Sequence, residues 1–215
     1  MDKKNVDYGL YLVTDRGLMS GRKIEDSVLS AIDGGVTIVQ LREKNSSSRE
    51  FFETALKIRE ICKSHNVPLI INDRADIAGA ADCDGVHIGQ SDLPVRAVRK
   101  IIGEDKIIGV SAGNVEKALR AQRDGADYIG VGALFPTSTK DNTVSVTPEE
   151  LSEIKKSVNI PVVAIGGINA ENIGALKNTG IDGVAVVSAI IAEKDVRAAA
   201  AEMKKWLKYY RIATN

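Results

Sequence analysis

Short apolar runs alternate with amphipathic segments along the whole chain. The runs are rich in Val, Ile and Leu, and they predict strands at residues 9–14, 36–41, 68–71, 85–88, 106–110, 128–131, 161–165 and 183–187. The segments between them carry apolar residues at helical spacing. They predict helices at residues 24–32, 93–102 and 114–123, others that end near residues 65, 81 and 177, one that begins at residue 148, and a closing helix at residues 195–210. The predicted caps of four of these helices are Ser46-Ser47-Ser48, Asn114, Thr147 and Asn169.

The strand segments are continuous apolar runs rather than alternating ones. This pattern is typical of strands that are buried on both faces of a parallel sheet. Eight strand-then-helix units without a linker predict an α/β fold, a single (β/α)8 TIM barrel with its active site at the C-terminal ends of the strands. We expect residues 1–215 to form one catalytic domain. A doubly wound open sheet is the alternative, but no G-x-G-x-x-G motif follows the first strand.

Composition narrows the classes of partner. Lys and Arg together number 29, as do Asp and Glu, so the formal net charge is zero and favours neither nucleic acid nor an anionic membrane. Cys62 and Cys83 lack the spacing of metal ligands. No apolar run is long enough to span a bilayer, and no N-terminal stretch combines a basic region with a long apolar run. We therefore expect a cytoplasmic protein. The sequence does not decide between a monomer and a homo-oligomer.

Polar side chains gather directly after the predicted strands, at positions that share one end of a barrel. They include Thr14, Gln40, Arg42, Lys44, Asn72, Asp73, Gln90, Asp92, Ser111, Thr137, Thr139, Lys140 and Ser188. Arg42, Lys44 and Lys140 surround one mouth, and three cations in a chain of zero net charge predict an anionic ligand with several oxygens. The alternative is that Arg42 and Lys44 only flank Glu43 on a solvated loop.

Two carboxylates lie among these cations. Asp73 and Asp92 each follow a different strand, and Mg²⁺ is commonly held by a few carboxylates together with water and phosphate oxygens. The pair therefore predicts a Mg²⁺ site for a diphosphate. Ordinary ion pairs with Arg42 and Arg74 are the alternative.

A second anion site is predicted beside the last two strands. Gly166-Gly167 and Val187-Ser188 each precede a predicted helix, and loops at this place in a barrel often hold phosphate through backbone N–H groups. The hydroxyls of Thr137, Ser138 and Thr139 add donors of the kind that phosphate binding uses. Close packing of a helix on a strand is a further reason for the glycines.

A general base is missing from this set. No nucleophile elbow occurs, and only two histidines, His65 and His87, are present. For His87, inside the fourth predicted strand, we favour a core histidine held by a hydrogen bond over an acid–base group. Such a site suits a reaction in which diphosphate leaves and a nucleophile that needs no deprotonation attacks.

Eight motifs in this order resemble the thiamine-phosphate synthase (thiamine phosphate pyrophosphorylase) family. They are LYLVTD at 10–15, VQLREK at 39–44, INDR at 71–74, GVHIGQSD at 85–92, GVS at 109–111, FPTSTK at 135–140, AIGGI at 164–168 and VAVVS at 184–188. The resemblance spans nearly the whole chain. Each motif alone is weak, but the ordered set is specific.

The resemblance implies a Mg²⁺-dependent transferase of thiamine biosynthesis. The family joins 4-amino-2-methyl-5-hydroxymethylpyrimidine diphosphate to 4-methyl-5-hydroxyethylthiazole phosphate, or to its carboxylated precursor, by a dissociative step that releases diphosphate. Carried over by position, the pyrimidine diphosphate would be bound by Gln40, Arg42, Lys44, Asn72, Ser111 and Lys140, of which Arg42, Lys44, Ser111 and Lys140 would be catalytic. Asp73 and Asp92 would hold Mg²⁺. The thiazole phosphate would be bound by Thr137, Thr139, Gly167, Val187 and Ser188.

Two other functions are compatible with a thiazole-phosphate pocket. Thiazole tautomerases share the fold but lack the full diphosphate and Mg²⁺ set, whereas this chain has Asn72, Asp73, Asp92 and Lys140. A non-catalytic thiazole-phosphate-binding protein would not need those residues. The synthase is therefore the function that the sequence predicts.

Overall fold

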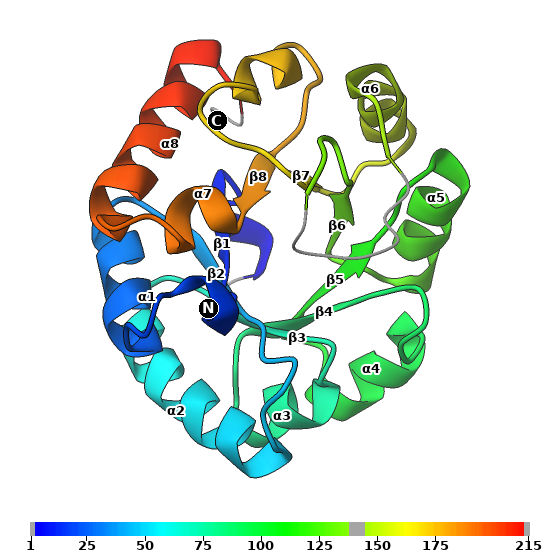
Figure 1. Cartoon of the computed structure of the whole chain (residues 1–215). Coiled ribbons are helices and arrows are strands. Elements are labelled where there is room, and N and C mark those ends of the chain that lie inside the picture. Colours follow the sequence, from blue (N-terminus) through cyan, green and yellow to red (C-terminus); the bar gives the residue numbers. More distant parts are fainter. Residues whose placement is uncertain (1–2, 138–144, 213–215) are drawn as a thin grey trace.

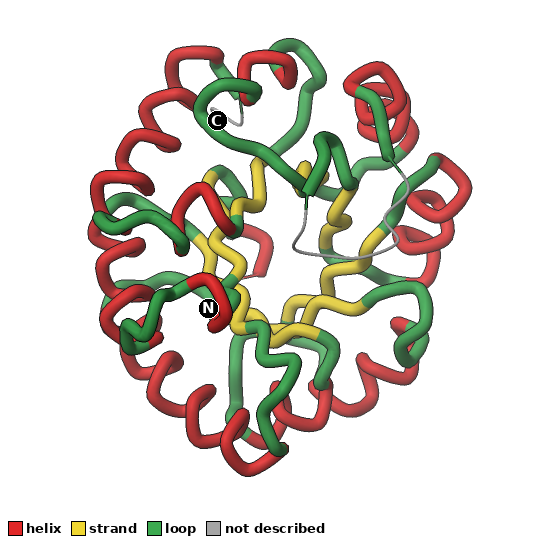
Figure 2. The backbone as a smooth tube through the Cα atoms, in the orientation of Figure 1, coloured by secondary structure: helices red, strands yellow, loops and turns green. Residues whose placement is uncertain are grey.

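The structure is a barrel of parallel strands surrounded by helices, as Figure 1 shows. It is a computed structural model and describes residues 3–137 and 145–212, without the side chain of Lys4. In these residues, eight strands pair in sequence order and close as β8 pairs with β1. The tube in Figure 2 separates the inner ring of strands from the outer ring of helices. The predicted single (β/α)8 barrel is confirmed.

The strands are short and the helices vary in length. The strands are β1 (Leu10–Val13), β2 (Ile38–Leu41), β3 (Leu69–Asn72), β4 (Gly85–Ile88), β5 (Ile107–Ser111), β6 (Tyr128–Val131), β7 (Val162–Ile165) and β8 (Gly183–Val186). The α-helices are α1 (Ile24–Asp33), α2 (Ser48–Ser64), α3 (Ala75–Ala80), α4 (Val95–Ile102), α5 (Val115–Asp124), α6 (Pro148–Ser157), α7 (Ser188–Ile191) and α8 (Val196–Tyr210). The 3₁₀ helices are η1 (Lys3–Asn5), η2 (Arg16–Leu18) and η3 (Ile173–Leu176).

The strands are continuous apolar runs because they bury both faces. Their outer faces pack against the helices in a large cluster that includes Leu12, Leu41 and Phe51. Their inner faces fill the barrel with a second cluster, in which Tyr11 and Tyr128 are the largest fully buried side chains. The interior is therefore a packed core, and ligands have access to its ends rather than its middle.

Side-chain caps begin several helices as the sequence predicts. The hydroxyls of Ser47 and Thr147 each accept a hydrogen bond from the backbone N–H three residues later. The carboxylates of Glu50 and Glu150 in turn accept one from the backbone N–H of Ser47 and Thr147. Asn114 caps α5 in the same way through the N–H of Lys117. These bonds satisfy backbone donors that the first turn leaves open.

We expect Thr147→Ala to lower the free energy of unfolding by about 1 kcal/mol, because it removes the hydroxyl that caps α6. Ser152→Ala, within the same helix, is the matched control and should change it by less than about 0.5 kcal/mol. Urea unfolding of both variants measures the difference. Equal stabilities would show that the cap contributes nothing.

One predicted helix is wrong. The sequence predicts a helix after β7 that is capped by Asn169 and ends near residue 177, but this segment contains only η3. The Asn169 side chain accepts from the backbone N–H of Glu171 and of Asn172, which makes a local turn in place of a helix start. The helix expected from residue 93 also begins later, at Val95, directly after Pro94.

Candidate active site

The loops after β1 and β2 are joined by two ion pairs. Arg42 Nη1 lies 2.8 Å from Asp15 Oδ2, and Arg16 Nη2 lies 2.7 Å from Glu43 Oε1. The backbone N–H of Arg42 also donates to Thr14 Oγ1 at 3.0 Å. Arg42 is thus held at the strand end rather than on a freely solvated loop, which argues against the alternative in which it merely flanks Glu43.

Lys44 and Gln40 differ sharply in exposure. Lys44 is exposed and, among the described residues, forms no ion pair. Gln40 is 5% exposed, and its Nε2 donates to the hydroxyl of Tyr11 at 2.9 Å. The end of β2 therefore presents the buried amide of Gln40, and the loop after it presents the solvent-exposed cation of Lys44.

The two predicted metal ligands follow neighbouring strands, β3 and β4. Asp73 is exposed and has a φ of 63°, a left-handed conformation that is strained for any residue other than glycine, although Asn and Asp tolerate it best. Its backbone N–H donates to the carbonyl of His87 at 2.8 Å. Asp92 Oδ2 accepts from the N–H of Gly89 at 2.6 Å. A hydrogen bond thus fixes the backbone of Asp73, and another fixes the carboxylate of Asp92.

The residues present suit a hard cation. Asp73 and Asp92 supply only oxygen donors, and Asp92 uses only Oδ2 in its bond to Gly89. Within the described ranges, no group of three or more His, Cys, Asp or Glu side chains gathers at one place. A bound Mg²⁺ would therefore need oxygens from water or from a phosphorylated ligand to complete its shell.

Polar contacts also extend from the end of β5. Ser111 is half-buried, and its carbonyl accepts from Gln90 Nε2 at 2.7 Å. Arg120 on α5 in turn donates to Gln90 Oε1. Gln90 thus links the loop after β4 to β5 and α5.

The loops after β6 and β7 pack closely against each other. The N–H of Phe135 donates to the carbonyl of Gly166 at 3.0 Å. Gly167 has a φ of 65°, and a Cβ there would lie 2.5 Å from the carbonyl oxygen of Pro136. Glycine is needed at this position for both its conformation and its size. The close packing at this glycine pair is with the β6 loop, not between a helix and a strand as the sequence suggested, and phosphate binding by the pair stays a prediction.

The remaining predicted residues divide between described and masked parts of the chain. Thr137 is half-buried at the end of the β6 loop, while Thr139 and Lys140 lie outside the described residues. Val187 is half-buried and precedes α7, which Ser188 begins. All of the described candidates lie in the last two residues of a parallel strand or in the segment after it, so they lie at the same end of the barrel.

Sequence reasoning missed two features of this site. Asp15, the partner of Arg42, was visible as a polar residue after the first strand but received no role. The second is a set of hydrogen bonds inside the barrel, in which Tyr11, Tyr128 and His87 take part. His87 bonds through both ring nitrogens, which confirms a hydrogen-bonded histidine.

The cysteines are unsuited to nucleophilic chemistry. Burial raises the pKa of Cys62, and it raises the pKa of Cys83 to about 12. Neither thiol therefore forms appreciable thiolate near neutral pH.

In the described part of the chain, no helix is both long and apolar enough to cross a membrane.

Comparisons with known proteins agree on one family. A family model described as thiamine monophosphate synthase matches residues 10–190. The thiamine-phosphate synthase of Ruminiclostridium cellulolyticum is 61% identical over 94% of this chain and 96% of its own, and that of Clostridium botulinum is 58% identical over 94% and 95%. The structure of a thiamine phosphate pyrophosphorylase from Pyrococcus furiosus superposes with a TM-score of 0.87 at 39% identity, covering 95% of this chain and 98% of that one.

Proposed function

Because the chain belongs to the thiamine monophosphate synthase family, we propose that it forms thiamine phosphate from a hydroxymethylpyrimidine diphosphate and a hydroxyethylthiazole phosphate. This membership confirms the family resemblance seen in the sequence and places the chain among the transferases. We propose further that residues 1–215 act as one catalytic domain, and that it works in the cytoplasm, where charged phosphate esters are retained.

The observation that carries the proposal is the convergence of cations and carboxylates at one end of the barrel. Arg42 follows β2, and Asp73 and Asp92 follow β3 and β4, so the three groups come from consecutive strands. An anion with many oxygens can bind to both kinds of side chain, because it pairs with the cations and shares a metal ion with the carboxylates.

The pyrimidine diphosphate is assigned to the side of the barrel that β2 to β5 form. Its diphosphate would meet Arg42, Lys44 and Lys140, and its ring would meet the residues deeper in the mouth, which are Gln40, Asn72 and Ser111. Asp73 and Asp92 would hold Mg²⁺ beside the diphosphate. When bound, Mg²⁺ would neutralise charge on this leaving group.

The thiazole phosphate is assigned to the opposite side. Thr137 and Thr139 would supply hydroxyls, and the backbone N–H groups around Gly167, Val187 and Ser188 would supply the remaining donors. The close contact between the β6 and β7 loops supports this assignment, because it brings Thr137 and Gly167 onto adjoining segments.

The reaction exchanges one bond for another without a proton transfer. The bond between the pyrimidine methylene carbon and the diphosphate oxygen breaks, and its electron pair leaves with the diphosphate. The lone pair of the thiazole ring nitrogen then forms the new carbon–nitrogen bond. Arg42, Lys44 and Lys140 would stabilise the charge that develops on the departing oxygen, and Ser111 would orient the pyrimidine. This scheme needs no general base, in keeping with the expectation from the sequence.

The direct test supplies purified protein with both substrates and Mg²⁺ and follows thiamine phosphate and diphosphate by chromatography. We expect the two products in equal amounts, and we expect chelation of the metal to stop the reaction. Binding of either substrate without product would refute the synthase and favour a binding protein. Isomerisation of the thiazole in the absence of the pyrimidine would favour a tautomerase.

A further inference from the structure

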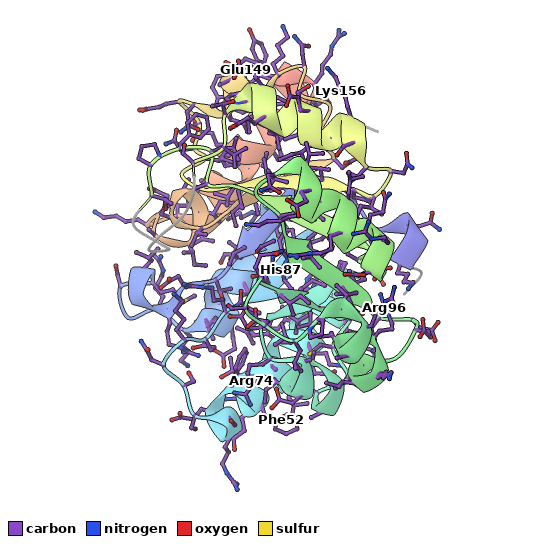
Figure 3. The ribbon with its side chains drawn as sticks, turned by 90° about the vertical axis from the view of Figure 1, so that its right-hand side faces the viewer. Phe52, Arg74, His87, Arg96, Glu149 and Lys156 are labelled. Carbon is purple, nitrogen blue, oxygen red and sulfur yellow. The ribbon has the colours of Figure 1, made fainter. Side chains whose placement is uncertain are left out.

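A continuous set of side-chain hydrogen bonds crosses the inside of the barrel. Gln40 Nε2 lies 2.9 Å from the hydroxyl of Tyr11, which lies 2.8 Å from that of Tyr128. The Tyr128 hydroxyl lies 2.9 Å from His87 Nδ1, and His87 Nε2 lies 3.0 Å from Ser111 Oγ. Figure 3 shows His87 toward the centre of the molecule, whereas Arg96 and Lys156 lie on outer helices. The series joins β2 to β5, which are three strands apart around the barrel.

Both phenols in this series keep their protons. Tyr11 and Tyr128 are each 1% exposed, and burial raises the pKa of both hydroxyls above the ordinary value. Each therefore donates one hydrogen bond and accepts others. In the described part of the chain, Tyr11 bonds only to Gln40 and Tyr128, and Tyr128 bonds only to Tyr11 and His87.

Counting donors gives the series a single direction. Gln40 donates to the Tyr11 oxygen, so the proton of Tyr11 must point to Tyr128. The proton of Tyr128 then points to His87 Nδ1, which has to accept. A neutral imidazole that accepts at Nδ1 carries its proton on Nε2 and donates it to Ser111 Oγ. The hydroxyl proton of Ser111 is left for another acceptor.

Glycines on two strands make room for this arrangement. A Cβ on Gly109 would lie 2.4 Å from the hydroxyl oxygen of Tyr128, and a Cβ on Gly130 would lie 3.0 Å from His87 Cε1. Any larger residue at position 109 would displace the central phenol. The local sequence of β5 thus accommodates the hydrogen-bonded ring of β6.

We propose that Tyr11, Tyr128 and His87 are positioning residues, whose one-way hydrogen bonds present Gln40 Oε1 as an acceptor and the Ser111 hydroxyl as a donor. Gln40 Oε1 has no partner among the described residues, so it can accept from a ligand. The ligand class that fits is a neutral heteroaromatic ring with an exocyclic N–H donor at one edge and a ring-nitrogen acceptor elsewhere. This inference rests on the proposed function in taking Gln40 and Ser111 as contacts of an aminopyrimidine.

The direct test is ¹⁵N NMR of the histidine side chains in the ligand-free protein. We expect Nδ1 of His87 to be unprotonated and its Nε2 to carry a proton, as the hydrogen bonds require. His65→Gln assigns the signals, because His65 and His87 are the only histidines. A His87 protonated on Nδ1 would overturn the proposal, since every bond in the series would then run the other way. This measurement needs no barrel variant and no enzymatic activity.

Tyr128→Phe interrupts the series at its centre. We expect the Nε2–H tautomer of His87 to be no longer the main one. We also expect KM for the pyrimidine diphosphate to rise about tenfold, while KM for the thiazole phosphate changes less than about twofold. Tyr8→Phe is the matched control. The Tyr8 ring is buried, and its centroid lies 5.0 Å from that of the Tyr128 ring. In the described residues, the Tyr8 hydroxyl forms no hydrogen bond in the series. Tyr11→Phe replaces Tyr128→Phe if the latter does not fold.

The two readouts separate this inference from the proposed function. A His87 protonated on Nε2 in a protein without synthase activity would leave the hydrogen-bond series standing and refute the function. Synthase activity with unchanged KM values in Tyr128→Phe would refute the positioning role and leave the function standing.

Discussion

Asp73→Asn is expected to lower kcat by about 100- to 1,000-fold, the range seen when one electrostatic contact to a developing charge is removed. The carboxylate at this position is assigned to the Mg²⁺ that accompanies the diphosphate, and an amide is a poor ligand for that ion. Asparagine is the sharpest substitution because it tolerates the φ of 63° that Asp73 adopts. Steady-state kinetics at several Mg²⁺ concentrations measures the effect.

Asp76→Asn is the matched control for this change. Asp76 is exposed in α3, three residues further along, and its carboxylate lies 2.6 Å from Arg74 Nη2. Losing this exposed ion pair should leave kcat within about twofold, because such pairs contribute little. An Asp73→Asn enzyme with a wild-type rate at ordinary Mg²⁺ would reject the metal-binding role, whereas partial rescue by excess Mg²⁺ would support it.

The positions after the strands predict the outline of the candidate site, because parallel strands of a barrel have their C-terminal ends at one place. Arg42, Asp73 and Asp92 can be selected in this way from sequence alone, since each is a charged residue within four positions of the end of an apolar run. Position after a strand does not indicate which of these side chains pair with one another. It did not pair Arg42 with Asp15, because both positions simply counted as polar residues after a strand.

The hydrogen bonds inside the barrel were invisible for a different reason. Tyr11 and Tyr128 lie within apolar runs, so their rings suit a buried core, and their hydroxyls meet across a separation of 117 residues. Only the closure of the barrel brings β1 and β6 within bonding distance through the interior. Periodicity finds which residues are buried, but it does not find which buried polar atoms meet.

The failed helix after β7 shows a limit of capping signals. Asn169 was read as a helix cap, and its side chain does accept from backbone N–H groups, but those of Glu171 and Asn172 form a turn. Asn172 then donates from Nδ2 to the carbonyl of Gly167 at 2.8 Å, which ties the turn to the site loop. The same asparagine chemistry serves caps and turns, so tertiary contacts decide between them.

Gly167→Ala is expected to raise KM for the thiazole phosphate at least tenfold and to destabilise the fold by about 1–3 kcal/mol. An alanine Cβ would lie 2.5 Å from the carbonyl oxygen of Pro136 and 2.8 Å from that of Phe135. Both neighbours are backbone atoms, so the β6 or β7 loop has to move. The assigned donors would then leave the phosphate, while KM for the pyrimidine diphosphate should change much less.

Gly180→Ala separates this clash from conformational strain. Gly180 has a φ of 77°, close to the 65° of Gly167, but a Cβ there would meet only Lys155 Cγ at 3.7 Å. This control should therefore cost about 1 kcal/mol of stability and leave both KM values unchanged. Urea unfolding and substrate titrations on the two variants measure these quantities. If Gly167→Ala behaved like Gly180→Ala in both, the close contact of the two loops would not position the phosphate, and the assignment of that phosphate to Gly167 would fail.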